Sequence, residues 1–417
     1  MDTVDESRLR ADLEANAEFG VIDAEEGRGR TVLAGTEANR RARELLLDRL
    51  RDAGLEVTVD AVGNVAGTWV PPEADPDAAP VAAGSHLDSV PEGGIFDGPL
   101  GVYAALEAVR AMQEADLILA RPVTVVSFTE EEGQRFGEGL LGSSVASDVR
   151  SVEQALGLAD GDGVTLRDAL DDIGARGEGR LDAGDWHAWL ELHVEQDTQL
   201  EAASVPVGVV TTITGIAHYE ATVVGEADHA GATAMDARRD ALPAASEVIR
   251  DVERAARELV ATDSETAVAT VGSVEIAPNA TNVVPGEIGM GIDVRDVERA
   301  SMDHLEDRIQ KSLARVARDR SVDTDLRRHL DVDPTPMSER VREAAHAVAS
   351  EAGVGAMDLH SGAAHDTMHV AGVTDAGLLF APSRDGASHS PREWTDWADC
   401  AAATRVLAGA IAQLAGE

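Results

Sequence analysis

The stretch from residue 209 to residue 330 narrows the possible folds more than any other part of the sequence. Periods of two and of about 3.6 residues alternate there in the order strand, helix, strand, strand, helix, strand. That order is the plan of the split βαβ, or ferredoxin-like, fold. The expected strands cover residues 218–224, 267–276, 286–294 and 324–330, and the expected helices cover residues 241–261 and 301–318.

The second of these helices carries a clear apolar stripe. A helix that packs one face on a sheet needs such a stripe. The pattern of strands and helices resumes after this segment, with a helical pattern at residues 341–352. We therefore predict that residues 209–330 form an inserted domain. The stripe consists of Met302, Leu305, Ile309, Leu313 and Val316.

The chain on both sides of the insertion has the pattern of one α/β domain. Val123–Phe128 is a continuous apolar run, typical of a strand buried on both faces of a parallel or mixed sheet, and Val81–His86 is a short apolar run that ends in polar residues. We predict a layered α/β domain in two parts, residues 1–208 and 331–417, with ligands beyond the carboxyl ends of its strands. Further elements are expected at residues 7–19, 37–53 and 102–112 (helices) and 55–70 (strand).

The charge of the chain excludes several kinds of partner. It has 35 Lys and Arg against 77 Asp and Glu, a formal net charge of −42. Such a field repels phosphate backbones and anionic lipid, which argues against nucleic acid and membrane surfaces. Residues 1–14 lack the layout of a signal peptide, no run approaches the ~18 apolar residues of a membrane helix, and the single Cys400 cannot form an intramolecular disulfide. We therefore expect a cytoplasmic protein.

The basic residues are almost all arginine, and Lys311 is the only lysine. Together with the net charge of −42, this composition favours adaptation to high salt. At ~1 M salt the Debye length shrinks to ~3 Å, so exposed carboxylates no longer repel one another. The alternative is an ordinary acidic protein from a mesophile.

A His, an Asp and a second Asp in a glycine-rich loop form the first chemical motif, "GSHLDSVPEGGIFDGPLG". His86 can supply a neutral imidazole to a metal ion, and Asp88 can orient it from behind. Asp97 can bridge two ions through its two oxygens. Taken alone, the same His and Asp pair also fits a surface turn.

Three adjacent carboxylates, Glu130 to Glu132, form the second motif, "FTEEEGQRF". They repel one another unless a cation or protons relieve the repulsion. A solvated acidic loop is the alternative in a chain this acidic. The motif directly follows the expected apolar strand Val123–Phe128, and this position favours a functional site.

Further polar residues stand near the ends of apolar segments. His193 lies in the strand-like run "ELHVEQD", where an isolated His is also compatible with a core residue. Each of the other motifs is weak alone, but they recur on both sides of the insertion and within it. These motifs hold His229 in "GEADHAGATAMDARRDA", Asn282 and Arg295 in "PNATNVVPGEIGMGIDVR", His365 in "LHSGAAHD" and His389 in "GASHSPREW".

Taken in order, the motifs resemble those of the two-metal amidohydrolases that include N-carbamoyl-L-amino acid hydrolase, β-ureidopropionase and allantoate amidohydrolase. These enzymes are relatives of aminoacylases and dinuclear zinc exopeptidases. The resemblance extends from about Asn64 to Trp394. It implies a two-domain, exopeptidase-like α/β catalytic domain, with the ferredoxin-like βαββαβ insertion as a lid or dimerisation domain. It also implies a homodimer.

The resemblance implies a metal-binding role for five residues. His86 and His193 resemble the ligands of one ion, Glu132 and His389 resemble the ligands of the other, and Asp97 resembles the bridge. The cofactor implied is two divalent metal ions per chain. Zinc, manganese, cobalt and nickel all suit this ligand set.

The resemblance also implies the residues that act on the substrate. Glu131 resembles the general base, which takes a proton from the attacking water and passes it to the leaving nitrogen. His229 resembles a residue that stabilises the oxyanion, commonly across a dimer interface. His365 falls in a family motif, as a substrate contact or as a support of the site. The groups that resemble ligands of the substrate carboxylate are Gln196, Asn282 and Arg295.

The implied activity is hydrolysis of a linear amide or ureide. The expected small-molecule substrate is an N-carbamoyl-L-amino acid, with the amino acid, ammonia and carbon dioxide as products. A chain of net charge −42 repels an anionic substrate, so Arg295 is expected to bind its carboxylate locally. Allantoate amidohydrolase and an aminoacylase or dipeptidase are the alternative enzymes. A non-catalytic scaffold on the same fold is an alternative of another class, against which Glu131 beside a full ligand set argues.

Overall fold

The computed structural model describes residues 3–137 and 139–417, which form two compact units. The first unit consists of the chain up to Thr211 together with Met337–Glu417. The second unit is Thr212–Pro336, which corresponds to the insertion expected at residues 209–330.

The first unit is built on a mixed sheet that has nine strands within the described residues; β13 and the last two residues of β6 belong to the segment Thr212–Pro336. The strand order is β1-β2-β4-β3-β5-β15-β6-β13, and β14 also pairs with β6. Strands β4, β3, β5 and β15 are mutually parallel neighbours, so their carboxyl ends lie on one edge of the sheet. The bounds are β1 (Glu56–Val59), β2 (Val65–Trp69), β3 (Val81–His86), β4 (Val123–Phe128), β5 (Ala188–Val194), β6 (Val207–Ile213), β13 (Thr335–Pro336), β14 (Ala356–Ser361) and β15 (Ala376–Ala381).

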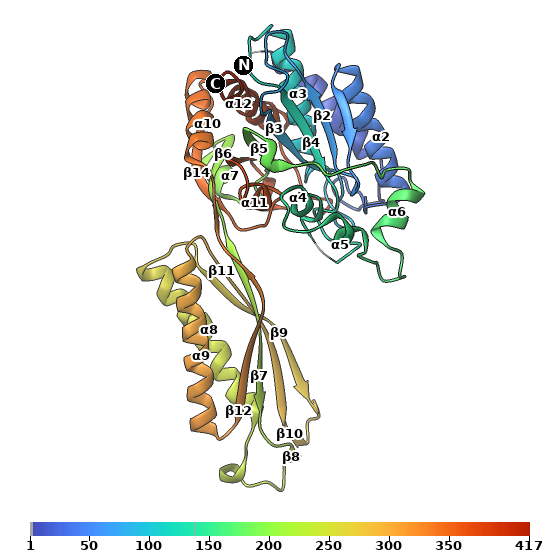
Figure 1. Cartoon of the computed structure of the whole chain (residues 1–417). Helices are drawn as coiled ribbons and strands as arrows, with labels where there is room; N and C mark the ends of the chain where they lie inside the picture. Colours follow the sequence, from blue (N-terminus) through green and yellow to red (C-terminus); the bar gives the residue numbers. More distant parts are fainter. Residues whose placement is uncertain (1–2, 138) are drawn as a thin grey trace. The chain divides into compact units, whose positions relative to one another are not determined.

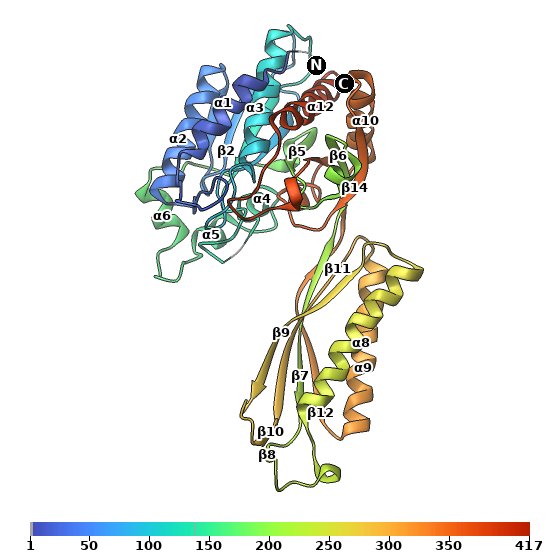
Figure 2. The same cartoon turned by 180° about the vertical axis from the view of Figure 1, so that it is seen from behind.

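Helices cover both faces of this sheet. Alternate strand residues belong to different cores: Ala83 packs with α3 and α12, whereas Ala82 packs with α4 and α11. Figure 2 shows α1, α3 and α12 close together, and all three helices contribute to the core that contains Ala83. No helix among the described residues combines the length and the apolar character needed to cross a bilayer. The bounds are α1 (Glu6–Ala17), α2 (Glu37–Asp52), α3 (Pro99–Glu114), α4 (Leu141–Ala146), α5 (Val152–Leu156), α6 (Leu166–Asp172), η1 (Ala183–Asp185), α7 (Gln199–Ala203), α10 (Glu339–Ala352), α11 (Thr367–Val370), η3 (Arg384–Gly386) and α12 (Trp397–Ala415).

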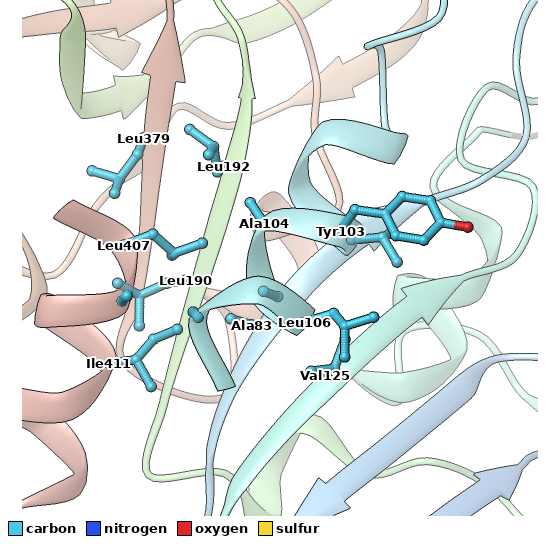
Figure 3. Packing of buried hydrophobic residues seen from close by; sticks show 14 of the residues in the cluster. Ala83, Tyr103, Ala104, Leu106, Val125, Leu190, Leu192, Leu379, Leu407 and Ile411 are labelled. Atoms are coloured by element: carbon cyan, nitrogen blue, oxygen red, sulfur yellow. The ribbon is translucent and has the colours of Figure 1, made fainter. Parts of the chain in front are cut away.

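The main core lies between the central parallel strands and the helices α3 and α12. Figure 3 shows leucines of β5 and β15 beside Leu407 and Ile411 of α12. Tyr103 and Leu106 of α3 belong to the same cluster. These side chains are fully or almost fully buried. The core thus fixes the four parallel strands whose ends carry the polar motifs.

The prediction of a single strand at residues 55–70 of the first unit is wrong. The run at residues 55–70 was expected as one strand but forms two antiparallel strands, β1 and β2. A tight turn separates them, with the N–H of Asp60 donating to the carbonyl of Asn64 at 3.0 Å. Gly63 in this turn has φ +87°, a conformation that few other residues adopt readily. The apolar periodicity continues on both sides of the turn, which conceals it in the sequence.

The second unit confirms the predicted order of elements. Its four main strands, among the described residues, form an antiparallel sheet in the order β12-β7-β11-β9, which is the ferredoxin-like arrangement. Helices α8 and α9 lie side by side on one face (Figure 1), and the predicted stripe of α9 is buried there. The bounds are β7 (Gly215–Val224), β8 (Asp228–His229), η2 (Met235–Ala237), α8 (Ala241–Thr262), β9 (Val268–Ala277), β10 (Val283–Val284), β11 (Glu287–Asp296), α9 (Arg299–Arg320) and β12 (Asp323–Val332).

Candidate metal centre

The polar motifs of the first unit meet at the carboxyl edge of its parallel strands. His86 is the last residue of β3, and His193 lies one residue before the end of β5. Glu131 and Glu132 follow β4, and His389 follows β15 after a loop. Because these strands are parallel neighbours, segments far apart in the sequence bring their side chains to one place.

Two groups of potential ligands share Asp97. The first consists of His86, Asp97 and His193, and the second of Asp97, Glu132 and His389. Within each group the ligand atoms lie within 4.8 Å of one another.

The two oxygens of Asp97 face different groups. Oδ1 lies 3.4 Å from Nε2 of His86 and 3.3 Å from Nε2 of His193. Oδ2 lies 3.5 Å from Nε2 of His389, which is also 3.5 Å from Oε2 of Glu132. This placement suits a carboxylate that bridges two cation sites.

Backbone carbonyls orient the two buried imidazoles. Nδ1 of His86 lies 3.1 Å from the carbonyl oxygen of Asp88, and Nδ1 of His193 lies 3.1 Å from that of Val194. A proton on each Nδ1 leaves the lone pair of Nε2 directed at the centre, which is the tautomer that a metal ligand needs.

The donor set fits a divalent cation. Nε2 of His86 is buried and has no hydrogen-bond partner in the described part of the chain. With its proton on Nδ1, Nε2 would otherwise bring a lone pair against the oxygens of Asp97 and of Glu131, the latter 3.8 Å away. A cation between these atoms turns this repulsion into attraction. Imidazoles and carboxylates in this number are typical ligands of zinc and neighbouring metals.

Asp88 contacts His86 through its backbone carbonyl. Its carbonyl, rather than its carboxylate, is the hydrogen-bond acceptor of His86, since Oδ1 lies 3.8 Å from Nδ1. The carboxylate instead accepts the backbone N–H of Glu131 at 3.3 Å and of Glu132 at 3.1 Å. Asp88 therefore binds both His86 at the end of β3 and the loop of Glu131 and Glu132 after β4.

Backbone conformation also shapes the centre. Gly98 has φ +79°, and a Cβ atom there would lie 2.5 Å from the ring of His86. Glu130, Gln196 and His389 have φ between 51° and 61°. Non-glycine residues adopt this left-handed conformation at a cost of ~1–2 kcal/mol each, so the surrounding contacts must fix these turns.

Burial and the charges of neighbouring groups shift the pKa values of the carboxylates in the centre. Burial, followed by the charge of Asp97, raises the pKa of Glu132 to about 8. Burial also raises the pKa of Glu131 well above its usual range, although the charge that His86 carries when doubly protonated, without a metal ion, opposes this effect. Burial alone would raise the pKa of Asp97 too, but His193 and His86 hold it well below its usual range. The centre therefore carries negative charge that needs protons or cations.

The two ligand groups differ in their access to solvent. The side chains of His86 and His193 are 1% and 2% exposed, whereas that of His389 is 53% exposed. The centre is therefore closed at the first group and open at the second.

Gln196 and His365 each contact one of the potential metal ligands. Nε2 of Gln196 donates to Oδ2 of Asp97 at 3.0 Å and to Oγ of Ser388 at 2.9 Å. His365 is buried with its ring centroid 4.6 Å from that of His193, and its Nε2 lies 3.1 Å from Oγ of Ser361. Burial and the charge of His193 hold the pKa of His365 well below its usual range. His365 thus packs on a ligand as a neutral ring.

Three predicted site residues lie in the second unit. His229 in β8 pairs with Val283 in β10, and the N–H of Ala230 donates to the carbonyl of Asn282 at 2.9 Å, so His229 and Asn282 are neighbours. Arg295 lies on β11, where its Nε donates to both carboxylate oxygens of Asp293, at 3.1 and 3.2 Å.

Two buried charges beside the centre were missed by the sequence analysis. Glu393 accepts the backbone N–H groups of Phe96 and Asp97, each at 3.0 Å. The guanidinium of Arg30 is fully buried and donates to the carbonyl of Leu87 at 2.9 Å. Glu393 lies four residues after His389, which was the one available signal; Arg30 stands in no motif.

Comparison with known proteins gives consistent results. A family model described as "Peptidase family M20/M25/M40" matches residues 82–413. An N-carbamoyl-L-amino acid amidohydrolase of Geobacillus stearothermophilus is 38% identical over 402 residues, which are 95% of this chain and 96% of the relative. An allantoate amidohydrolase of Bacillus subtilis is 33% identical over 369 residues, 87% of each chain.

Solved structures share the fold. An amidase of the hydantoinase/carbamoylase family from Burkholderia multivorans matches with a TM-score of 0.92 and 35% identity, covering 99% of this chain and 98% of that one. This likeness and the order of the elements confirm the predicted fold, an exopeptidase-like α/β domain with an inserted βαββαβ domain.

Proposed function

The chain belongs to the peptidase family M20/M25/M40, and from this membership we propose that it hydrolyses N-carbamoyl-L-amino acids to the amino acid, ammonia and carbon dioxide. The relative of that name is 38% identical over almost the whole chain. The observation that carries the proposal is the convergence of two ligand groups on Asp97, with Glu131 beside them. Allantoate is the second candidate substrate, supported by the relative that is 33% identical.

Two divalent ions are the proposed cofactor. His86 and His193 would hold one ion, Glu132 and His389 would hold the other, and Asp97 would contact both. When bound, such ions act as Lewis acids toward a water molecule and the substrate carbonyl. Zinc, manganese, cobalt and nickel all suit these ligands.

Glu131 is the proposed general base. Its side chain is 11% exposed, and Oε2 lies 3.8 Å from Nε2 of His86. Because burial raises its pKa, this carboxylate binds a proton more readily than an exposed glutamate. Oε2 of Glu131 takes the proton of the attacking water and then delivers it to the leaving nitrogen, since an amide anion is a poor leaving group.

His229 is the proposed hydrogen-bond donor to the oxyanion. Its Nδ1 accepts the backbone N–H groups of Gly231 at 3.0 Å and Ala232 at 3.1 Å. Nδ1 therefore carries the lone pair, and the ring proton of the neutral imidazole resides on Nε2. An Nε2–H group stabilises negative charge as it develops on the substrate oxygen.

The proposed ligands of the substrate carboxylate are Arg295, Asn282 and Gln196. Asp293 orients the guanidinium of Arg295 by accepting from its Nε. A planar guanidinium binds a carboxylate with two parallel hydrogen bonds. The amide of Gln196 already donates to Asp97 and to Ser388, so a substrate carboxylate would have to replace Ser388 as its second acceptor.

A homodimer is proposed as the working form. Strand β9 lies at the end of the strand order of the second unit and is largely exposed, so its backbone can pair with another chain. If His229 acts on the centre of a partner chain, a mixture of His229→Ala and Glu131→Gln chains recovers activity that neither variant has alone. Inactive mixed dimers would contradict an action of His229 across the interface.

The decisive test compares substrates in molar salt with the metal-reconstituted full chain. We expect kcat/KM for an N-carbamoyl-L-amino acid to exceed that for allantoate, an N-acyl amino acid and a dipeptide. A preference for allantoate would support the second candidate, and a preference for an acyl amino acid or dipeptide would contradict both. A folded chain that binds no divalent ion would favour a non-catalytic scaffold.

A further inference from the structure

Glu393 is a buried carboxylate that contacts the centre through the backbone. The residue is 1% exposed and lies between His389 and the start of α12. Its Oε1 accepts two hydrogen bonds, from the N–H groups of Phe96 and Asp97, each at 3.0 Å. The segment that carries His389 is thus bonded to the loop that carries Asp97.

The segment that carries Glu393 and the loop that carries Asp97 are closely packed at this contact. Phe96 is fully buried and Asp97 is 4% exposed. Without an acceptor, their buried N–H groups would destabilise the folded protein. A Cβ atom at Gly94 would lie 2.2 Å from Oε1 of Glu393, so the loop approaches the carboxylate as closely as only glycine permits. The position of the Asp97 backbone is therefore set by Glu393.

Arg30 is a second buried residue that binds the same loop. Its N–H donates to the carbonyl of Gly93 at 3.0 Å, and its guanidinium donates to the carbonyl of Leu87, the residue after His86. Asp97 and Glu393 are among the charges that favour the ionised form of this buried guanidinium. Glu393 and Arg30 thus both bind the backbone of residues 93–97.

Asp97 needs such fixation more than the other ligands do. Its two oxygens face different groups at 3.3 to 3.5 Å, so a small shift of its backbone would move one oxygen away from its partners. The imidazoles have their own anchors, which are the carbonyls of Asp88 and Val194.

We propose that Glu393 is a positioning residue of the metal centre, which sets the distance between the two cation sites by tying the His389 segment to the Asp97 loop. The proposal rests on the proposed function only in that Asp97 and His389 bind metal. It assigns to Glu393 no contact with metal or substrate.

Titration of the chelator-stripped full chain with Co²⁺ tests this role in wild type, Glu393→Gln and Glu393→Leu. We expect Leu, which removes the acceptor, to weaken Co²⁺ binding by about ten- to a hundredfold and to change the visible absorption of the bound Co²⁺. Gln keeps an acceptor oxygen and should restore most of the affinity and the spectrum. Activity is not needed for either readout.

Glu107→Gln is the matched control. Glu107 is also fully buried and accepts a backbone N–H, that of Asp5 at 2.8 Å, but it lies on α3 among Arg8 and Arg110. We expect this variant to lower the melting temperature of the stripped protein while leaving Co²⁺ affinity within about twofold of wild type.

Three results would overturn the proposal: unchanged Co²⁺ affinity and spectrum in folded Glu393→Leu, equal losses in Gln and Leu, or an equal loss in the Glu107 control. If Leu does not fold, Glu393→Ala, which also removes the acceptor, takes its place in the comparison with Glu393→Gln, with the same expected loss of Co²⁺ affinity and change of spectrum. Failure of wild type to bind Co²⁺ would instead refute the proposed function.

Discussion

The carboxylate of Asp88 accepts the backbone N–H of Glu132 through Oδ2 at 3.1 Å. Its other oxygen accepts the N–H of Glu131, and its carbonyl accepts from Nδ1 of His86. One residue therefore orients a ligand at the end of β3 and the two functional carboxylates after β4.

Replacement of Asp88 by Asn should disrupt this arrangement. An amide has one acceptor oxygen, so its NH₂ group would meet one of the two N–H donors. We expect kcat/KM to fall about ten- to a hundredfold, as for other residues that orient metal ligands. The measurement is steady-state kinetics together with metal content after dialysis. Asp12→Asn, which alters a buried Asp bonded to Arg49 and Arg110, should change stability but not metal content; equal effects of the two variants would contradict the assigned role.

Glu131→Gln should separate chemistry from metal binding. Glutamine has a similar size but cannot carry the proton that Oε2 of Glu131 is proposed to move. We expect kcat to fall by about two to four orders of magnitude. Metal content, measured by emission spectroscopy, should stay at the wild-type value. A variant that loses both ions together with its activity would show that Glu131 serves mainly as a ligand.

The ions should leave the centre in two steps. The side chain of His389 is 53% exposed, whereas those of His86 and His193 are almost completely buried. A chelator therefore reaches the group of Glu132 and His389 first. We expect a fast and a slow phase of metal release in stopped-flow chelation, and His389→Ala should remove only the fast one. A single phase in wild type would show that the two sites release metal together.

The buried Asp366 gives a prediction for pH. Burial, followed by the charge of Glu191, raises its pKa from a usual value of 3.8 to about 8. The folded state thus binds the proton more tightly than the unfolded state, so the stabilising contribution is full below about pH 4 and is lost as pH rises to about 8. In metal-stripped protein, the melting temperature should fall more steeply over this range in wild type than in Asp366→Asn. Parallel curves would contradict the raised pKa.

Adaptation to high salt stays a prediction that stability measurements can test. The net charge of −42 favours expansion in dilute buffer, and ~1 M salt screens this repulsion. We expect the melting temperature to rise markedly between ~0.05 and ~1 M KCl. An uncharged osmolyte of equal osmolality serves as the control, because it does not screen charge. A melting temperature independent of salt would indicate an ordinary acidic protein.

Much of the fold could be predicted because its central strands have a strong local signal. Strands β3 and β4 begin and end where their apolar runs do. The polar residues that follow parallel strands necessarily meet at one edge, which is why widely separated motifs could be grouped. The boundary of α3 was less accurate: it begins at Pro99, because Gly98 provides the turn and proline suits the first helical position.

Other features of the centre depend on contacts that no local pattern records. The sequence shows that Asp88 follows His86 by two residues, but not whether its carbonyl or its carboxylate is the acceptor. Glu393 and Arg30 are single charged residues whose importance arises from burial beside the Asp97 loop. Burial is a property of the assembled fold, so these residues became visible only in the structure.

The place of β15 has a consequence for biosynthesis. Among the described strands it is the last in the chain, yet it lies between β5 and β6 near the middle of the sheet. While the ribosome is still making this segment, β5 has no neighbour on that side, and an open strand edge readily pairs with other nascent chains. The part of the sheet that is made first therefore keeps an unpaired strand edge until translation is almost finished.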